Sequence, residues 1–125
     1  MIDFKNGMLF KLKPIPNEEV HQGVKRLLID GEEIISAFQT IRDQLVFTNK
    51  RIISVNVQGI TGKKIDFTSI PYNKIQTFSI ESAGTLDLDT ELDIFISSIG
   101  KIRFEIKAEY DIVELGKVIS EFVLR

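Results

Sequence analysis

The stretch at residues 45–55 places the tightest limit on what this chain can fold into. It reads LVFTNKRIISV, two apolar runs that meet at the polar residues 48–51. Apolar runs rich in β-branched and aromatic residues are typical of strands, and the polar junction between them is typical of a tight turn. The residues after this stretch have the patterns of further strands and then of one amphipathic helix. The sequence therefore predicts a mainly β domain closed by a C-terminal helix.

Size and composition exclude several classes of protein. A length of 125 residues fits one domain with one core. The chain has no cysteine, which excludes disulfides, thiolate metal sites and thiol nucleophiles. The net charge of −2 and the scattered basic residues argue against nucleic-acid binding, which requires a basic face. No apolar run reaches the ~18 residues of a membrane span and no signal peptide is visible, so we expect a cytoplasmic location.

The first 31 residues read differently from the rest. Residues 1–16 mix apolar residues with lysines and end in Pro14 and Pro16, which predicts an irregular or short helical arm that packs on its own domain or on a neighbouring copy. Asn17 is placed to cap a helix that ends near Gly31. Its apolar stripe consists of Val20, Val24, Leu27 and Leu28. We therefore expect an arm and a short helix at 1–31 and a β domain at 32–125. The single histidine, His21, lies off the stripe and receives no role.

Seven strands are predicted from Ile34 onward. In the third, Ile53 and Val55 share one face and Ser54 the other, a pattern typical of a half-buried antiparallel strand. In the fifth, the inward phase switches between Ile75 and Phe78, which predicts a bulge near residues 76–77. The last two strands, at 92–96 and 102–106, form a predicted hairpin.

The C-terminal segment has the signature of an amphipathic helix. Asp111 followed by Glu114 fits a capping box. A single apolar stripe is formed by Ile112, Leu115, Ile119 and Phe122. Burying such side chains is worth roughly 1.5–3 kcal/mol each. If the Phe122 ring is fully buried, its replacement by alanine is expected to cost roughly 3–5 kcal/mol.

The sequence has few side chains in an arrangement that suits catalysis. Without cysteine, and with one histidine that has no obvious orienting partner, no nucleophile and base are visible. The sequence predicts a protein that is not an enzyme and needs no cofactor.

One acidic segment has a spacing that could suit a metal site. Asp87, Asp89 and Glu91 stand on alternate residues, an arrangement able to hold a hard cation. The calcium-loop pattern fails, because Leu92 and Ser98 stand where it needs glycine and glutamate. We expect a solvated acidic loop and no metal.

Two polar segments have both a structural and a functional interpretation. Lys63 and Lys64 follow a glycine-rich segment that weakly resembles a phosphate-binding loop, but a strand comes next where such a loop needs a helix. A hairpin turn is favoured there, with attraction to phosphate or lipid headgroups as the alternative. Thr48–Arg51 is either a simple turn, with Asn49 in a left-handed conformation, or part of a polar recognition surface at one sheet end together with Arg42 and Asp43.

The order of several motifs resembles a known family. The motifs are VFTNKRII at 46–53, QGITGKK at 58–64, SIPY at 69–72 and FSIESAGTLDLDTEL at 78–92. They resemble, in that order, signature segments of the bacterial pleckstrin-homology-like domain family, over roughly residues 32–124, with the N-terminal arm outside the match.

The resemblance implies a fold, an assembly and a surface. The implied fold is a seven-stranded, strongly bent antiparallel barrel capped by the C-terminal helix. Family members form cyclic homo-oligomers, five-fold in known examples, and present a polar surface between adjacent subunits that is thought to bind another protein. By motif, the candidates for that surface are Arg42, Asp43, Thr48, Asn49, Lys50 and Arg51, with Asp87, Asp89 and Glu91 as weaker ones.

The sequence supports two hypotheses on function. The leading one is a non-enzymatic module that forms a homopentameric ring and recognises an unidentified protein. The alternative is peripheral membrane binding through lipid headgroups at Lys63 and Lys64, which a net charge of −2 weakens.

Overall fold

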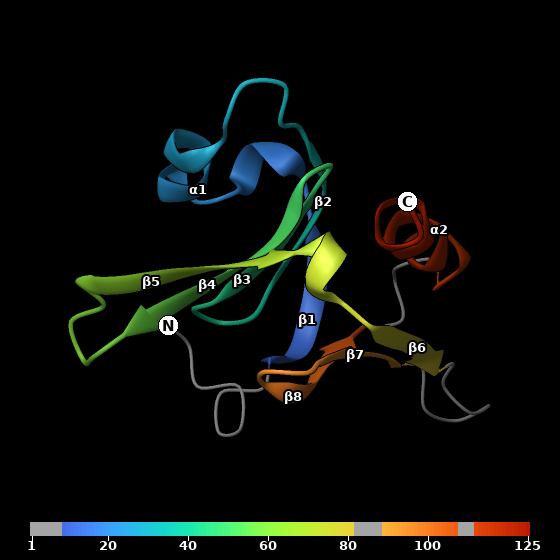
Figure 1. The fold of residues 1–125 in the computed structure, drawn as a ribbon. Coiled ribbons are helices and arrows are strands. Elements are labelled where there is room, and N and C mark those ends of the chain that lie inside the picture. The colour runs from blue at the N-terminus through green and yellow to red at the C-terminus, as the bar shows by residue number, and fades with distance from the viewer. Residues whose placement is uncertain (1–8, 82–88, 108–111) are drawn as a thin grey trace.

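The computed structural model describes residues 9–81, 89–107 and 112–125. They form eight strands and two α-helices (Figure 1). The strands are β1 (Leu9–Ile15), β2 (Ile34–Gln39), β3 (Gln44–Thr48), β4 (Arg51–Gln58), β5 (Lys64–Pro71), β6 (Thr77–Glu81), β7 (Thr90–Ile96) and β8 (Gly100–Ile106). The helices are α1 (Gln22–Leu27) and α2 (Ile112–Val123), and single 3-10 turns occur at η1 (Asn17–Glu19) and η2 (Tyr72–Lys74).

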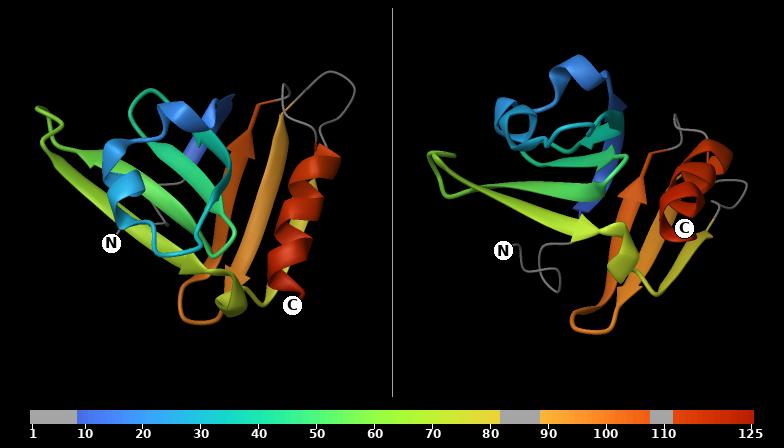
Figure 2. Two further views of the ribbon diagram at one scale, coloured as in Figure 1. Left: turned by 90° about the horizontal axis from the view of Figure 1, so that it is seen from above. Right: turned by 45° about the horizontal axis from the view of Figure 1, so that its top comes forward.

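The eight strands form one bent sheet in the order β5-β4-β3-β2-β1-β8-β7-β6. Neighbouring strands are antiparallel except β1 and β8, which are parallel. Figure 2 shows the two halves, β2–β5 and β6–β8, set at an angle with β1 between them. The segment that contains η1 and α1 covers the first half of the sheet, and α2 lies along the second half (Figure 2). The mainly β fold with a C-terminal helix is confirmed.

Two apolar clusters hold this arrangement together. The larger joins both halves of the sheet to α2 and contains the fully buried Phe47, Phe104 and Leu115. The smaller lies between α1 and the first half and contains Val24 and Ile53. Strand β3 is buried along its whole length, because apolar layers cover both of its faces. Its continuous apolar sequence, unlike an alternating one, reflects that double burial.

The strand count of seven was one too low, because the N-terminal segment is not an irregular arm. Residues 9–15 form β1, which joins the two halves of the sheet. Sequence reasoning took Pro14 as a stop, since a proline cannot donate to a central ladder. In β1 the two ladders hardly overlap: Leu9 and Leu12 pair with β8, whereas Lys13–Ile15 pair with β2. Within the described residues Pro14 therefore has a ladder partner on one side only, like a residue of an edge strand.

The helix predicted from Asn17 to Gly31 is interrupted. The chain makes the 3-10 turn η1, an extended residue and then the short α1. His21, which received no role, caps α1, because its Nδ1 accepts a hydrogen bond from the amide of Gly23 at 2.9 Å. Val20 and Val24 are buried as predicted, whereas Leu27, which lies at the end of the shortened helix, is 45% exposed.

Other local predictions are confirmed in part. The hairpin of β7 and β8 is confirmed. Ser54 is fully buried, so β4 is not half-buried at that point. The phase switch after Ile75 comes from η2, which places Ile75 before the strand, and not from a bulge. The capping residue Asp111 lies outside the described residues. In α2, Leu115 and Ile119 are fully buried, whereas Phe122 is only partly buried.

Candidate functional site

The polar junction between β3 and β4 is the tight turn that the sequence predicted. The Thr48 hydroxyl oxygen accepts hydrogen bonds from the amides of Lys50 and Arg51, each at 3.0 Å, which closes the turn locally. Asn49 is not left-handed: among the described non-glycine residues, only Lys11 has a positive φ. Asn49 instead ties the turn to the chain before β2, because its Oδ1 accepts from the Glu33 amide and its Nδ2 donates to the Gly31 carbonyl.

A buried ion pair lies directly behind this turn. Arg51 donates to both carboxylate oxygens of Glu32, Nε to Oε2 and Nη2 to Oε1, each at 2.9 Å. The Glu32 side chain is 0% exposed and that of Arg51 is 21% exposed. Thr48 donates to Oε2 at 2.7 Å and the Ile29 amide to Oε1 at 3.0 Å. Both carboxylate oxygens are therefore satisfied.

These contacts set the protonation states of the cluster. Burial by itself raises the pKa of Glu32, but the hydrogen bonds from Arg51, Thr48 and Ile29 outweigh it, and the net pKa is lowered. Burial, and then the Glu32 charge, raise the pKa of Tyr72, whose hydroxyl donates to the Thr48 carbonyl at 2.7 Å. The side chains of Thr48 and Arg51 thus stabilise the fold through their hydrogen bonds to Glu32. Glu32 was not identified from the sequence.

The predicted recognition surface is divided between the two ends of β3. Thr48–Arg51 come at the end of that strand, whereas Arg42 and Asp43 precede it. Arg42 donates through Nη2 to the Gly59 carbonyl. Asp43 accepts from the Val57 amide at 2.9 Å. The structure therefore does not bring the six candidates together at one sheet end, because β3 lies between the two groups.

Asn49 and Lys50 border a small pocket of about 290 Å³ at their end of β3. Its other walls are Pro71, Tyr72, Asn73 and the end of α2. The rings of Tyr72 and Phe122 stack at 5.1 Å, and the Arg125 guanidinium lies 4.9 Å from the centre of the Phe122 ring. An aromatic wall with cations at its rim suits the recognition of a polar group on a partner.

The weaker candidates take part in cross-strand ion pairs. Arg103 contacts Asp93 at 2.8 Å and Glu91 at 3.0 Å, and the hydrogen bonds from Arg103 lower the pKa of Asp93. Asp89 lies 3.3 Å from Lys107, and Asp87 lies outside the described residues. No group of three or more side chains suited to holding a metal occurs in the part of the chain that the structure describes.

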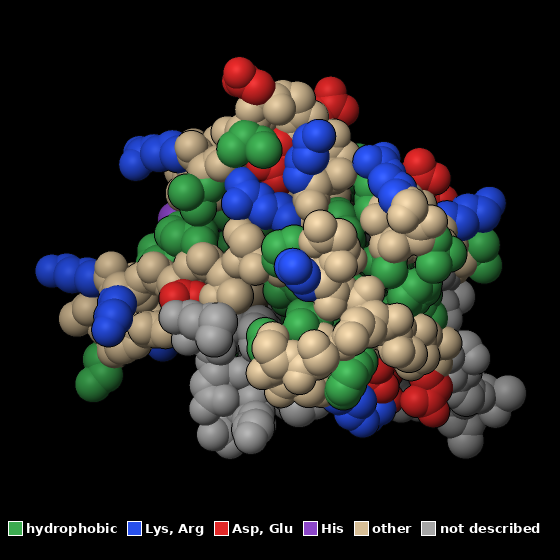
Figure 3. Space-filling model, viewed as in Figure 1, with side chains coloured by type: hydrophobic (Ala, Val, Ile, Leu, Met, Phe, Trp, Pro, Cys, Tyr) green, Lys and Arg blue, Asp and Glu red, His purple; other side chains and the backbone are tan. Residues whose placement is uncertain are grey.

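Lys63 and Lys64 lie at the far end of the β4–β5 hairpin, where basic side chains project on the left of Figure 3. Both are exposed. The loop joining β2 to β3 reaches this hairpin through the Arg42–Gly59 bond. Ile41 and Ile60, one on each loop, are fully exposed.

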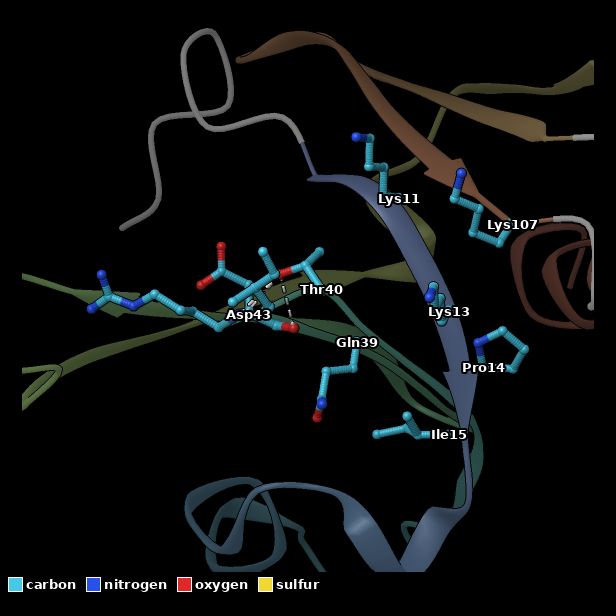
Figure 4. A pocket seen from close by; sticks show the side chains of 10 residues that line it. Lys11, Lys13, Pro14, Ile15, Gln39, Thr40, Asp43 and Lys107 are labelled. Carbon is cyan, nitrogen blue, oxygen red and sulfur yellow. Dashed lines mark hydrogen bonds between the residues drawn. The ribbon is translucent and has the colours of Figure 1, made fainter. Parts of the chain in front are cut away.

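A second, larger depression was not predicted from the sequence. It is an open groove of about 840 Å³ between β1 and the β2–β3 loop, which we call the basic groove. Its walls include Lys11, Lys13, Gln39, Ile41, Arg42 and Lys107. Figure 4 shows Lys11 and Lys13 along β1 and Lys107 at the end of the neighbouring β8. Asp43 is the one carboxylate among the described lining residues.

Lys11 has an unusual backbone. Its φ is 58°, and it lies where the register between β1 and β8 shifts, between Leu9 and Leu12. A left-handed conformation costs a non-glycine residue roughly 1–2 kcal/mol, and such strain is often found at functional sites.

Replacing Lys11 with glycine is expected to leave the protein equally stable or to stabilise it by up to about 1 kcal/mol. Glycine adopts a positive φ without strain, and this gain exceeds or balances its greater freedom in the unfolded chain. The free energy of unfolding in urea measures the change, with Lys13→Gly, at a site of ordinary φ, as the control that should be destabilised. A loss of more than about 1 kcal/mol in Lys11→Gly would contradict the left-handed conformation.

The open, bent sheet with α2 along its second half defines a domain of the pleckstrin-homology (PH)-like class. The chain belongs to the Bacterial PH domain family, whose sequence profile matches residues 3–123. The match includes the N-terminal segment that sequence reasoning placed outside the resemblance, in agreement with the position of β1 inside the sheet.

Known proteins of similar sequence or structure support this assignment. The uncharacterized protein YjqA of Bacillus subtilis is 40% identical over 119 residues, which cover 94% of this chain and 95% of that protein. The structure resembles a DUF1696 family protein with a PH domain from Shewanella loihica, with a TM-score of 0.79, 37% identity and coverage of 91% of this chain and 98% of that one. A PH domain from Shewanella amazonensis is similar with a TM-score of 0.66 and 38% identity, covering 89% and 90%.

A helix that crosses a membrane must have sufficient length and apolarity. Among the described residues no helix is long and apolar enough to cross a membrane.

Proposed function

We propose that this PH-like domain is not an enzyme, that it assembles into a closed ring of identical subunits, and that it presents a polar surface to a protein partner. The observation that supports assembly is the pair of unlike sheet edges. In the described chain β5 pairs only with β4, and β6 pairs only with β7. Such edges expose backbone donors and acceptors that favour pairing with another chain.

The two edges favour a ring over a simple dimer. When one surface of a subunit binds a different surface of the next, the contact is head-to-tail, and repetition closes a ring if the rotation permits. The family resemblance implies five subunits. Pro71, the last residue of β5, also borders the pocket with Asn49 and Lys50. A neighbour docked on β5 would therefore extend that pocket, which makes it our candidate for the partner-binding surface.

The proposal that the chain has no catalytic activity rests on its side chains. It has no cysteine, and His21 uses Nδ1 to cap α1. Arg51 and Thr48, which the sequence offered for recognition, are engaged with Glu32. The side chains that remain accessible beside the pocket, Lys50 and Asn73, suit binding more than proton transfer.

Lysines on the β6 edge are expected to break the ring. Thr77 and Ser79 have exposed side chains on this edge strand, and lysine on an edge opposes strand pairing through its charge. The double variant Thr77→Lys/Ser79→Lys should elute with the mass of one subunit in light scattering coupled to size-exclusion chromatography. The control Ser97→Lys/Ser98→Lys adds the same charge in the exposed β7–β8 turn and should keep the wild-type mass. An edge variant that also keeps the mass of the wild-type ring would contradict the role of β6.

A further inference from the structure

We propose that the basic groove binds an extended, acidic segment of a partner protein. This rests on the proposed role in protein recognition and adds the chemistry of the partner and a second binding surface, at the opposite end of β3 from the Asn49–Lys50 pocket. The charges of the groove, the free side of β1 and the spacing of its lysines each support that chemistry.

The groove has an excess of positive charge. Four cationic side chains line it against one carboxylate, that of Asp43. Asp43 is occupied by the Val57 amide and the Asn56 side-chain amide. Lys11 and Lys13 are exposed, and neither forms an ion pair with another described residue. Of the other two cations, Arg42 donates to the Gly59 carbonyl and Lys107 lies 3.3 Å from Asp89. An anionic ligand would therefore meet Lys11 and Lys13 as the cations that need not first leave a partner among the described residues.

The free side of β1 favours a peptide as that ligand. The β1–β2 ladder ends at the pair Lys13 and Gln39, where β2 also ends. Beyond it the chain turns into the β2–β3 loop, which the bond from the Thr40 amide to the Asp43 carbonyl holds at 2.8 Å. Among the residues that the structure describes, Leu9 and Leu12 have ladder pairs with β8 only. The groove lies beside this half of β1, where an added strand would continue the sheet.

The spacing of the lysines defines the sequence pattern of the peptide. Lys11 and Lys13 flank the buried Leu12, are exposed, and both line the groove. Side chains two residues apart in an extended peptide lie on one face, so carboxylates on alternate residues would match the two lysines. Ile15 and Ile41 also line the groove and supply apolar surface for the residues between the carboxylates. A membrane surface, in contrast, would be met by the loop tips with Ile60, Lys63 and Lys64, none of which lines the groove.

A labelled peptide tests this proposal on the full chain. The probe is a seven-residue acetylated peptide with glutamate at every second position, and its isomer has the same glutamates in one block. Fluorescence anisotropy in about 50 mM salt measures both affinities. The alternating peptide is expected to bind at least about fivefold more tightly than the isomer. Binding should weaken about tenfold or more in Lys11→Gly/Lys13→Ala, because two charge-assisted contacts are removed.

The matched control is Lys63→Ala/Lys64→Ala, which removes the same charge from the β4–β5 loop and should bind the peptide within about twofold of wild type, since neither lysine lines the groove. Equal binding of the two peptides, or equal loss in both lysine variants, would overturn the proposal. The proposal would also be overturned if the protein bound no peptide but bound vesicles containing phosphatidylserine, and if that binding required Lys63 and Lys64. That result would assign the end of the domain with the β4–β5 loop to membrane binding. If the protein is a monomer and binds the peptide, only the proposed ring is overturned. If the protein forms a ring and does not bind the peptide, only the proposed role of the basic groove is overturned.

Discussion

Replacing Arg51 with alanine is expected to lower the free energy of unfolding by about 3–5 kcal/mol at pH 7, because it leaves the Glu32 carboxylate buried without its cation. The Glu32 side chain is 0% exposed in the intact pair, and the variant loses both hydrogen bonds that Arg51 donates to its carboxylate. Arg51 also donates to the Leu27 carbonyl and to Ser69, and both contacts disappear in the variant. Urea unfolding followed by circular dichroism measures the change.

The matched control is Arg103→Ala. Arg103 also pairs with two carboxylates, Asp93 and Glu91, but these retain exposures of 16% and 32%. Solvent screens such pairs, so the expected loss is about 1 kcal/mol or less. Equal losses in the two arginine variants would contradict the special position of the Glu32–Arg51 pair.

The pH dependence provides an independent check on the same pair. The pKa of Glu32 is lowered in the folded protein, so the pair stabilises the fold above the unfolded pKa, and this contribution is lost as the pH falls through the lower folded value. In Arg51→Ala, burial without the cation should raise the pKa of Glu32 instead. The stability difference between wild type and variant should therefore be largest near pH 7. It should shrink as the pH falls, first through the raised pKa of Glu32 in the variant and then through its lowered pKa in the wild type. A difference that stays constant with pH would show that the carboxylate is not the cause.

Replacing Leu115 with alanine is the second change with a large expected effect, a loss of about 2–5 kcal/mol. Leu115 is fully buried in the cluster that joins α2 to both halves of the sheet. The sequence predicts a similarly large effect for Phe122 only if its ring is fully buried. The ring is partly buried and stacks on Tyr72 at the rim of the smaller pocket. Its replacement by alanine should therefore cost less than that of Leu115.

Thermal and urea unfolding of both variants, with Val113→Ala as the control, test this order. Val113 lies in the same helix and is 61% exposed, so its change should stay within about 0.5 kcal/mol. A larger loss in Phe122→Ala than in Leu115→Ala would contradict the packing of α2.

Most of the fold could be predicted from local patterns in the sequence. The apolar runs of β3 and β4 and the alternation in β7 and β8 reflect contacts between neighbouring strands, which leave a period in the sequence. β1 was missed because Pro14 is acceptable only through the small overlap of the β1 ladders, a property of the tertiary arrangement. The break between η1 and α1 was likewise invisible, because His21 gives no sequence signal as a cap.

The candidate site was harder to predict than the fold. Glu32 and Arg51 are 19 residues apart, and nothing in the sequence around Glu32 distinguishes it from Glu33, which is exposed. The basic groove combines Lys11 and Lys107, from opposite ends of the chain, through the parallel pairing of β1 with β8. The one available signal was the pair of lysines flanking Leu12, which is typical of a strand with one exposed face.

The mass of the wild-type protein in solution tests the proposed assembly most directly. Light scattering coupled to size-exclusion chromatography, over a tenfold range of concentration, should give a constant mass near five times the 14.2 kDa subunit. A ring closed through the β5 and β6 edges predicts that constancy, because closure satisfies both edges of every subunit. A mass of one subunit at every concentration would contradict assembly.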